Sequence, residues 1–363
     1  AGSMRILGPN CYGFVNALDR VSLWPDLHGL VPVARGVAII GQSSNVLINM
    51  TMQRRGLPIA AVVAVGNQAQ ATMAGIGSAL IEDPRITALG LHIEGLTDLP
   101  AFTALAARAF ELRKPVIVLK VGRSDQAQQA AISHTASLAG SHTGARALFD
   151  RLCMGMVDSP AEMMEALKIA HLTGGLRSAR IMSASCSGGE ASIMADLGLA
   201  KGLEFPPLGP DQTEALRAAL GPKVALANPL DYNTYIWDKE LALLDTFRAM
   251  MHGDLAMGCV VLDLPRGDRF EALSYEKVVR AVIAVAQSIE TPMAVLSLLP
   301  EGLPEDICER LIAGGVTPLC GMADSLGAIR ALAGIGRRPP GTVLLPGTGS
   351  DGAGRVIGEA EAK

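Results

Sequence analysis

Apolar and polar positions follow a repeating order along this chain: a short apolar run, a turn of small residues, then a stretch with helical spacing. Continuous apolar runs are typical of strands buried on both faces of a parallel sheet, and their alternation with helices is typical of doubly wound α/β folds. The pattern predicts a first unit with four strands, each of the first three followed by a helix, and a closing helix at about 160–172. The predicted strands are 36–40, 59–66, 88–95 and 115–122.

The same order resumes after Gly174-Gly175, which indicates a boundary. A second set of apolar runs, each followed by a helical stretch or a turn, predicts strands at 179–185, 257–264, 292–299 and 316–321. We therefore expect two α/β domains, at 1–173 and 174–338. Residues 339–363 are rich in Gly and Pro and are interpreted as a linker that ends in the start of a further helical domain. Arg5-Ile6-Leu7 resembles a strand without a preceding partner, so we expect an excised portion of a longer protein.

Composition narrows the classes of partner. The chain is 49% hydrophobic and only 4% aromatic, with a net charge of -4 and no run of Lys and Arg, so a nucleic-acid partner is not expected. It has no apolar stretch of the ~18 residues that a membrane span requires, and no signal-peptide pattern. The six cysteines are scattered, without a Cys-x-x-Cys motif, which indicates reduced thiols in a cytoplasmic protein and no metal site.

The first candidate for chemistry is His134, in the segment Ser133-His134-Thr135-Ala136-Ser137-Leu138-Ala139-Gly140. A neutral imidazole is a competent nucleophile near neutral pH, and the small neighbours would allow it to enter narrow sites. A lone histidine is more often a surface residue with one hydrogen bond. His142 lies nearby, where the next helix is predicted to begin, and we assign it a capping or surface role.

Two strand-to-helix turns are candidates for anion binding. Each places small residues at a helix N-terminus, where free N–H groups and the helix dipole favour negative charge. Either turn alone would be an ordinary turn with a serine cap. Together they suggest a phosphate site shared between the two units. The residues concerned are Ser43, Ser44 and Asn45 in the first unit, and Ser187, Gly188 and Gly189 in the second.

Glu94 is the third candidate, because it ends an apolar strand and carboxylates at that end of a parallel sheet face the ligand crevice. A carboxylate that accepts a hydrogen bond from one imidazole nitrogen leaves the other nitrogen free to react. On this pattern alone, a solvated glutamate at a strand end is an equally good interpretation.

Taken together, these segments resemble a known family. Gly8-Pro9-Asn10-Cys11, the sequence HIEG around Glu94, KVGRSDQAQQAAISHTASLAG and SCSGGEAS resemble the NDP-forming acyl-CoA synthetases. Within the succinyl-CoA synthetase superfamily, the match is best to the ADP-forming acetate–CoA ligases. Ala227-Asn228-Pro229-Leu230-Asp231 and the closing GEAEAK, similar to the start of an ATP-grasp domain, add to the resemblance, which spans nearly the whole chain.

The resemblance implies two flavodoxin-like domains, flanked in the family by a CoA-binding domain and an ATP-grasp domain. It assigns His134 as the phosphorylated histidine and Glu94 as the glutamate that orients it. The turns at Ser43-Ser44-Asn45 and Ser187-Gly188-Gly189 would hold the phosphohistidine. Asn10 and Cys11 would lie near the CoA thiol, and Gly66 and Asn67 would line the acyl site.

The implied reaction makes acyl-CoA from a small carboxylic acid, CoA and ATP with Mg, through phosphohistidine and acyl phosphate intermediates. CoA and ATP would bind mainly to domains outside this chain, so the isolated fragment should be inactive, and a homo-oligomer is expected. Ser44 and Glu190 depart from the family pattern, where glycine is common at both turns. Two alternatives remain: a non-catalytic ligand-sensing region of a synthetase-like protein acetyltransferase, and a pair of flavodoxin-like binding domains without catalysis.

Overall fold

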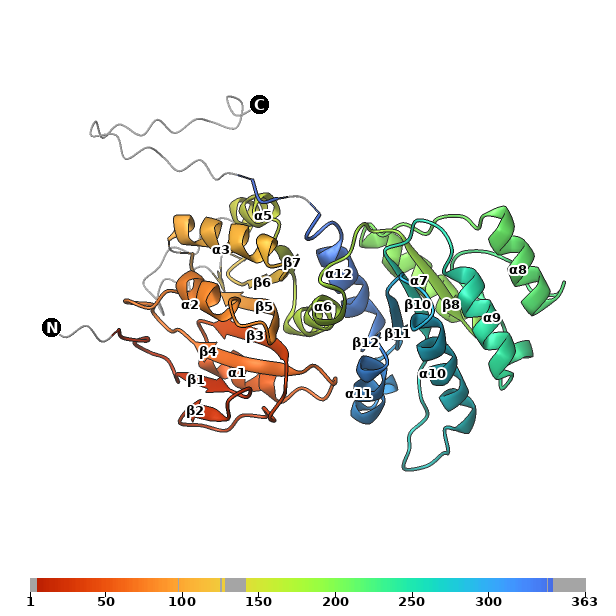
Figure 1. The fold of residues 1–363 in the computed structure, drawn as a ribbon, viewed down its shortest axis with the longest axis horizontal. Coiled ribbons are helices and arrows are strands. Elements are labelled where there is room, and N and C mark those ends of the chain that lie inside the picture. Colours follow the sequence, from red (N-terminus) through yellow and green to blue (C-terminus); the bar gives the residue numbers. More distant parts are fainter. Residues whose placement is uncertain (1–4, 97, 125, 128–141, 338, 342–363) are drawn as a thin grey trace, which may run out of the picture.

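The computed structural model describes residues 5–96, 98–124, 126–127, 142–337 and 339–341. These residues form two β-sheets, one for each half of the chain, with helices between and around them (Figure 1). His134 and almost all of the predicted linker lie outside the described residues.

The first sheet contains seven strands in the order β2-β1-β4-β3-β5-β6-β7. From β4 to β7 every pairing is parallel, and the order of these five strands is that of flavodoxin-like folds. The strands β3 to β6 are almost entirely buried, which explains their continuous apolar runs. The strands are β1 (Phe14–Asn16), β2 (Val21–Leu23), β3 (Gly36–Gly41), β4 (Ile59–Ala64), β5 (Ile86–Ile93), β6 (Val116–Lys120) and β7 (Gly155–Val157).

The second sheet has five strands in the order β12-β11-β10-β8-β9, all parallel. Read from β9, this is again the flavodoxin-like order. The predicted α/β class with two flavodoxin-like sheets is therefore confirmed. The strands are β8 (Ile181–Ser185), β9 (Leu230–Asp231), β10 (Met257–Val261), β11 (Met293–Leu296) and β12 (Val316–Leu319).

Helices cover both faces of each sheet. On one side of the first sheet lie α2 (Met73–Leu80), α3 (Leu99–Glu111) and α5 (His142–Arg151); α1 (Ser44–Thr51) and α6 (Pro160–Thr173) lie on the other. The second sheet packs on one face against α7 (Gly188–Ala200) and α12 (Met322–Leu332). Its other face packs against α8 (Pro210–Leu220), α9 (Glu240–Met250), α10 (Leu273–Ala286) and α11 (Glu305–Ala313). Two 3-10 turns, η1 (Thr234–Ile236) and η2 (Pro300–Gly302), complete these elements.

The two sheets share one hydrophobic core. Helix α6 packs against β5 of the first sheet and against β12 and α12 of the second, as its position in Figure 1 shows. Nine consecutive residues of this helix, from Glu162 to Ala170, are buried, so it is covered on all sides. A single cluster of buried apolar side chains runs from Ile39 in β3 through Leu167 in α6 to Leu296 in β11.

Charged side chains are buried at this junction. The carboxylate of Glu165 contacts Arg55 Nη1 at 2.7 Å and Lys168 Nζ at 2.8 Å, and it accepts a hydrogen bond from the backbone N–H of Cys320 at 2.8 Å. The side chains of Glu165 and Lys168 are fully buried. Burial alone would lower the pKa of Lys168, but the adjacent Glu165 charge raises it above its ordinary value. Residues from both halves of the chain thus meet in one network.

The edge of the first sheet differs from the prediction. Residues 5–7 form no strand, so that prediction was wrong. Instead, β1 and β2 form a hairpin whose strand β1 pairs antiparallel with β4, and the sheet is mixed at this edge. Strands of three residues give too short a pattern to detect by alternation, and the exposed β2 has no buried face to mark it. The short β7 and β9 and the helices α8, α9 and α11 were also not predicted.

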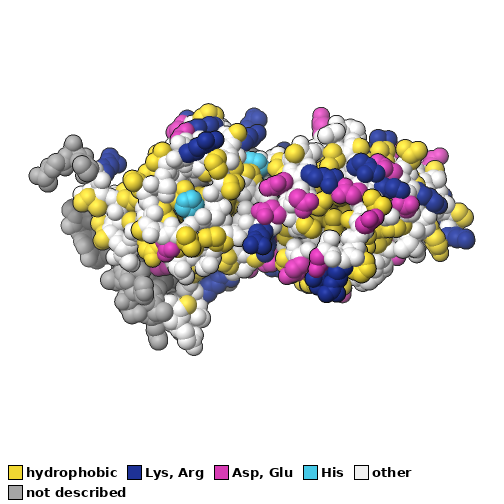
Figure 2. Space-filling view, turned by 90° about the horizontal axis from the view of Figure 1, so that it is seen from below, with side chains coloured by type: hydrophobic (Ala, Val, Ile, Leu, Met, Phe, Trp, Pro, Cys, Tyr) yellow, Lys and Arg dark blue, Asp and Glu magenta, His cyan; other side chains and the backbone are white. Residues whose placement is uncertain are grey.

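On the face shown in Figure 2, Lys and Arg side chains lie among Asp and Glu side chains and form no single basic field. None of the helices in the described part of the chain is long and apolar enough to cross a membrane. Within the same residues, no group of three or more His, Cys, Asp and Glu is arranged to hold a metal ion.

Candidate functional site

A cavity of about 400 Å³ lies at the carboxyl ends of β3, β4 and β5. This is the edge at which doubly wound sheets bind ligands. The cavity brings together eight residues predicted from the sequence, contributed by the N-terminal segment, two turns and one strand end, with Tyr12 and Gln42 completing its wall. The eight are Asn10, Cys11, Ser43, Ser44, Asn45, Gly66, Asn67 and Glu94.

The turn after β3 is built as an N-cap. Ser43 caps α1, and its hydroxyl accepts a hydrogen bond from the backbone N–H of Val46 at 3.4 Å. The hydroxyl of Ser44 accepts a hydrogen bond from the backbone N–H of Tyr12 at 3.1 Å. Helix α1 has no acidic side chain in its first turn, so its positive dipole end and free N–H groups are open to an anion in the cavity.

Gln42 fixes the strand end that holds Glu94. Its side-chain oxygen accepts hydrogen bonds from the backbone N–H groups of Glu94, at 2.5 Å, and of Gly95, at 3.0 Å. The backbone N–H of Gln42 donates in turn to the carbonyl of His92 at 3.3 Å. The turn after β3 and the end of β5 are therefore one hydrogen-bonded unit, and Glu94 lies opposite the N-terminus of α1.

Lys120 was not identified from the sequence, although it belongs to this site. It ends β6, is 2% exposed, and its Nζ donates to the carbonyl of Glu94 at 2.9 Å and to that of Val121. Burial lowers the pKa of Lys120, while the nearby Glu94 carboxylate opposes this shift. A lysine at the end of an otherwise apolar strand is the signal that could have revealed it.

The segment around Pro9 is held against the turn after β4 by close backbone contact. Asn67 N–H donates to the Pro9 carbonyl at 3.0 Å. Gly66 has φ +51°, and a Cβ there would lie 2.2 Å from the Pro9 carbonyl oxygen and 2.4 Å from that of Asn10. Glycine is therefore required at this position, and it allows Asn10 and Cys11 to line the cavity.

The predicted pair of Glu94 and His134 is untested, because His134 lies outside the described residues. His142 does begin α5, as predicted, and its Nδ1 has no hydrogen-bond partner among the described residues. Burial is the main cause that lowers its pKa, followed by the charges of Arg123 and Arg146.

The second predicted turn, Ser187-Gly188-Gly189, does not line the cavity described above. Ser187 precedes α7 as its N-cap, without a side-chain cap hydrogen bond, and Gly188 and Gly189 begin the helix. The residues that flank this turn, Cys186 and Glu190, line a separate cavity of about 280 Å³. Among the described residues, the two turns line no common cavity, so a shared phosphate site stays a prediction.

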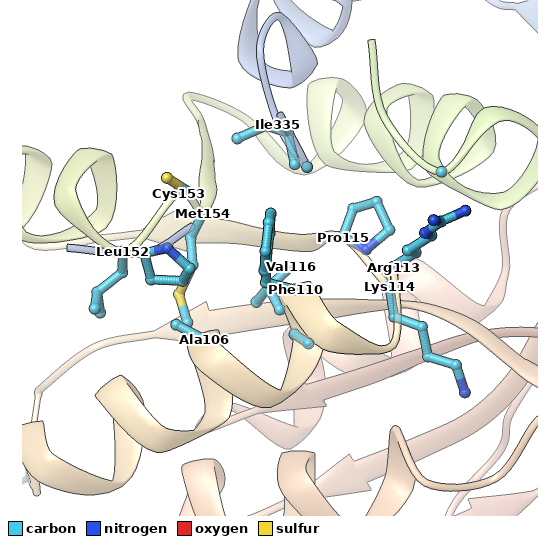
Figure 3. A pocket seen from close by; sticks show the side chains of 14 residues that line it. Ala106, Phe110, Arg113, Lys114, Pro115, Val116, Leu152, Cys153, Met154 and Ile335 are labelled. Carbon is cyan, nitrogen blue, oxygen red and sulfur yellow. The ribbon is translucent and has the colours of Figure 1, made fainter. Parts of the chain in front are cut away.

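Two further hollows contain none of the predicted site residues. The largest, about 760 Å³, lies beside α5, β7 and α12 and has walls of mixed charge. The hollow in Figure 3 lies between the end of α3, Pro115-Val116 at the start of β6, and Ile335. Its volume of about 30 Å³ is room for about one water molecule, and it lies at the sheet edge opposite to Glu94.

The chain is similar in sequence to known proteins. The family model described as "Succinyl-CoA ligase like flavodoxin domain" matches residues 34–170. An alpha subunit of an ADP-forming acetate–CoA ligase II from Pyrococcus furiosus is 31% identical over 235 residues, 63% of this chain and 49% of that protein. The chain is thus similar in sequence to ADP-forming acyl-CoA ligases.

Other relatives differ in the acid that they are named for. An ADP-forming 4-hydroxybutyrate–CoA ligase from Nitrosopumilus maritimus is 24% identical over 92% of this chain and 47% of its own length. A trans-feruloyl-CoA synthase of an unknown prokaryotic organism is 28% identical over 73% of this chain and 38% of its own length. The chain thus spans about half or less of these curated ligases.

The fold is also that of a solved structure. A dinucleotide-forming acetyl-coenzyme A synthetase 1 of Ca. Korarchaeum cryptofilum, in complex with phosphate and ADP, superposes with a TM-score of 0.76 at 22% identity. The match covers 92% of this chain and 71% of that one. At this identity the likeness supports the arrangement of the sheets and helices.

Proposed function

We propose that this chain is the phosphoryl- and acyl-transfer part of an ADP-forming acyl-CoA ligase, which makes acyl-CoA from a carboxylic acid, CoA and ATP. The observation that supports this most strongly is the cavity of about 400 Å³ at the carboxyl ends of β3, β4 and β5, called the first cavity from here on. In it, Glu94 faces the N-terminus of α1. The relatives, all ADP-forming ligases or CoA synthases where described above, support the same reaction class.

In the proposed reaction, His134 accepts the γ-phosphoryl group of ATP at one ring nitrogen, and ADP leaves. A carboxylate oxygen of the acid then attacks phosphorus; the P–N bond breaks, and its electron pair returns to the imidazole. The sulfur of the CoA thiolate attacks the acyl carbon of the acyl phosphate, and the C–O bond breaks to release phosphate. Phosphoryl transfer depends mainly on positioning and on stabilising charge.

The residues of the first cavity would supply both the positioning and the charge stabilisation. The free N–H groups of α1, beginning after Ser43, would bind phosphoryl oxygens without a side-chain cation. The Glu94 carboxylate would accept a hydrogen bond from the other nitrogen of His134 and stabilise the phosphorylated, cationic ring. Gln42 and Lys120 act as positioning residues, because they hold the backbone of Glu94 through its N–H and its carbonyl.

Ser44, Asn45, Gly66 and Asn67 would line the acyl site, and Asn10 and Cys11 would lie near the CoA thiol. Their common cavity supports this assignment. The three relatives described above are named for different acids, so the acid is described here only as a carboxylic acid.

The proposal includes the organisation of the whole enzyme. Residues 1–173 and 174–338 would be two flavodoxin-like domains, because each contains one complete sheet. CoA and ATP with Mg would bind mainly to CoA-binding and ATP-grasp domains of the same protein or of a partner subunit, in a cytoplasmic homo-oligomer. The 363 residues alone would therefore make no acyl-CoA, and robust turnover by the purified chain would contradict this organisation.

The central test is phosphorylation of the complete ligase that contains this chain. ATP labelled at its γ-phosphate, without acid or CoA, should leave an acid-labile and alkali-stable label on His134. His134→Ala should remove both the label and acyl-CoA formation. Glu94→Gln keeps a hydrogen-bonding group but removes the charge, and should slow turnover by about 10²–10⁴-fold.

His142→Ala is the matched control, because it removes the neighbouring histidine and should retain the label. A label that persists in His134→Ala and disappears in His142→Ala would reassign the carrier to His142. The absence of any histidine label in the wild-type enzyme would favour the non-catalytic, ligand-sensing alternative.

A further inference from the structure

Two cysteine thiols meet at the buried junction between the two sheets. Cys308 lies in α11, Cys320 directly follows β12, and their sulfur atoms are 3.8 Å apart. Both residues are fully buried, and both are free thiols. A disulfide bond would require the sulfur atoms to approach to about 2.05 Å. This is a small movement for side chains of two adjacent elements that already touch.

A buried cation lies beside one of the two sulfur atoms. The Nζ of Lys168 is 3.4 Å from the Cys320 sulfur, and the Lys168 side chain is fully buried. A neighbouring lysine stabilises the thiolate, which is the nucleophilic form of cysteine. The hydrogen bond with Cys308 lowers the pKa of Cys320, and the Lys168 charge lowers it further, against the effect of burial. The same hydrogen bond, with burial, raises the pKa of Cys308. The pair is therefore asymmetric, with Cys320 as the stronger nucleophile.

Cys259 provides a comparison within the same chain. It lies in β10 and is as fully buried as the pair, and burial raises its pKa to about 12. A thiol that is only buried is inert at neutral pH. The proximity of a second thiol and of Lys168 thus distinguishes Cys320 from an ordinary core cysteine.

Arg55 connects the pair to a hollow at the surface. This hollow has a volume of about 350 Å³, lies between α1 and α6, and has Arg55 in its wall. The Arg55 side chain is 22% exposed, and its Nη1 donates to the Cys320 carbonyl at 3.4 Å. A displacement of this one side chain would open a path from the hollow towards Cys320 for a molecule as small as hydrogen peroxide.

We propose that Cys308 and Cys320 are a redox-sensitive thiol pair, which peroxide converts to a disulfide with Cys320 as the attacking sulfur. This modification site is separate from the first cavity and does not depend on the ligase reaction proposed above. Disulfides in cytoplasmic proteins are usually transient and redox-sensing, so the reduced pair of the structure would be the resting form.

The proposed oxidation has two steps. The Cys320 thiolate attacks one oxygen of hydrogen peroxide, the O–O bond breaks, and the departing hydroxide takes up the proton that Cys320 lost. This gives a sulfenic acid on Cys320 and one water. The Cys308 sulfur then attacks the Cys320 sulfur and loses its proton, the S–O bond breaks, and the hydroxide leaves with that proton as a second water. The two thiols lose two electrons, which peroxide gains.

The test uses a variant of the 363-residue chain in which the three partly exposed cysteines are serine: Cys11→Ser, Cys153→Ser and Cys186→Ser. Thiols are counted in denaturant after treatment with hydrogen peroxide. The count should fall from three to one, and dithiothreitol should restore it. Peptide mass spectrometry should find Cys308 linked to Cys320 and Cys259 still free, so Cys259 is the matched internal control.

Single variants assign the roles. With Cys308→Ser, dimedone should trap a sulfenic acid on Cys320, whereas Cys320→Ser should leave Cys308 with roughly tenfold less label. Lys168→Met should slow disulfide formation about tenfold, because it removes the cation that favours the thiolate. A junction that was merely loosened would expose the thiols and speed the reaction, so a slower reaction reports activation. Circular dichroism confirms that each variant is folded.

Three outcomes would overturn the proposal. The first is three free thiols after exposure to peroxide that oxidises glutathione under the same conditions. The second is loss of Cys259 as fast as loss of the pair, which would indicate general opening of the core. The third is a sulfenic acid on Cys308 in Cys320→Ser with none on Cys320 in Cys308→Ser, which would reverse the roles. Disulfide formation that is not slowed by Lys168→Met would remove Lys168 as the activating group.

Discussion

Glu165→Gln should be strongly destabilising, because it breaks the buried network at the junction of the two sheets. In the native protein the Glu165 carboxylate neutralises part of the charge of Arg55 and Lys168, at 2.7 and 2.8 Å, and accepts the N–H of Cys320. The amide would leave two cations without a counter-charge, one of them fully buried. Removing one partner of a buried ion pair costs about 3–5 kcal/mol, and we expect a loss in this range.

The measurement is urea unfolding, followed by both circular dichroism and tryptophan emission. The control is Glu82→Gln, which removes a carboxylate that contacts Arg108 at 2.6 Å but is half exposed. Exposed pairs contribute about 0–1 kcal/mol, so this variant should unfold almost as the wild type does. A double variant, Glu165→Met with Lys168→Met, should recover part of the loss, because it removes the unpaired buried cation.

The two outcomes that would refute this reasoning are specific. If Glu165→Gln costs no more free energy of unfolding than Glu82→Gln, the buried charges are solvated or rearrange readily. If the double variant is less stable than Glu165→Gln, Lys168 stabilises the junction through packing rather than through its pairing with Glu165.

Three further predictions follow from the first sheet. Gly66→Ala should lower the free energy of unfolding by about 2–4 kcal/mol, because the added Cβ would clash with two carbonyl oxygens and the residue would keep a strained φ. Gly315→Ala is the control for backbone strain alone, because Gly315 has φ +78° and open space around it. Equal losses of stability in urea unfolding would contradict the clash at Gly66. His92 is 2% exposed, and burial, followed by the charge of Lys120, lowers its pKa to about 4. The unfolded state therefore binds a proton at a higher pH than the folded state does. The free energy of unfolding should be full above pH 6.5 and fall by roughly 3 kcal/mol towards pH 4. His92→Leu should flatten part of that decline in thermal unfolding, and an unchanged pH profile would contradict it. Ser44→Gly in the complete ligase should change relative kcat/KM among acids of different size by about 1–3 kcal/mol of discrimination, and an unchanged acid profile would remove Ser44 from the acyl site.

The strands of both sheets were predictable because they are buried on both faces. Runs such as Ile59–Ala64 and Met257–Val261 have no exposed position, so their apolar pattern is unbroken. The hairpin of β1 and β2 was not predictable for the opposite reason: β2 is wholly exposed, and both strands have three residues. Its place in the sheet depends on pairing with β4, a contact between distant segments that no local pattern records.

The first cavity was largely predictable, since strand ends and turns of a parallel sheet meet at one edge. Lys120 was missed because its role depends on the carbonyl of Glu94, 26 residues away. The acidic character of the cavity lined by Cys186 and Glu190 was only partly predictable from the sequence. Glu190 is adjacent to the turn in sequence, but Asp231, Asp263 and Tyr275 come from distant elements and meet it only after folding.

The burial of α6 limits how the two halves of the chain can move against each other. The helix is buried between the two sheets and anchored by Glu165 and Lys168 to Arg55 on one side and Cys320 on the other, so a sliding motion of the halves would have to break these contacts. A hinge there would expose fully buried charges and a continuous apolar core. The distance between the cavities at the two sheet edges is therefore fixed by this helix. In the proposed reaction, a phosphoryl group would reach a more distant site on a segment of chain, and not by rotation of one half against the other.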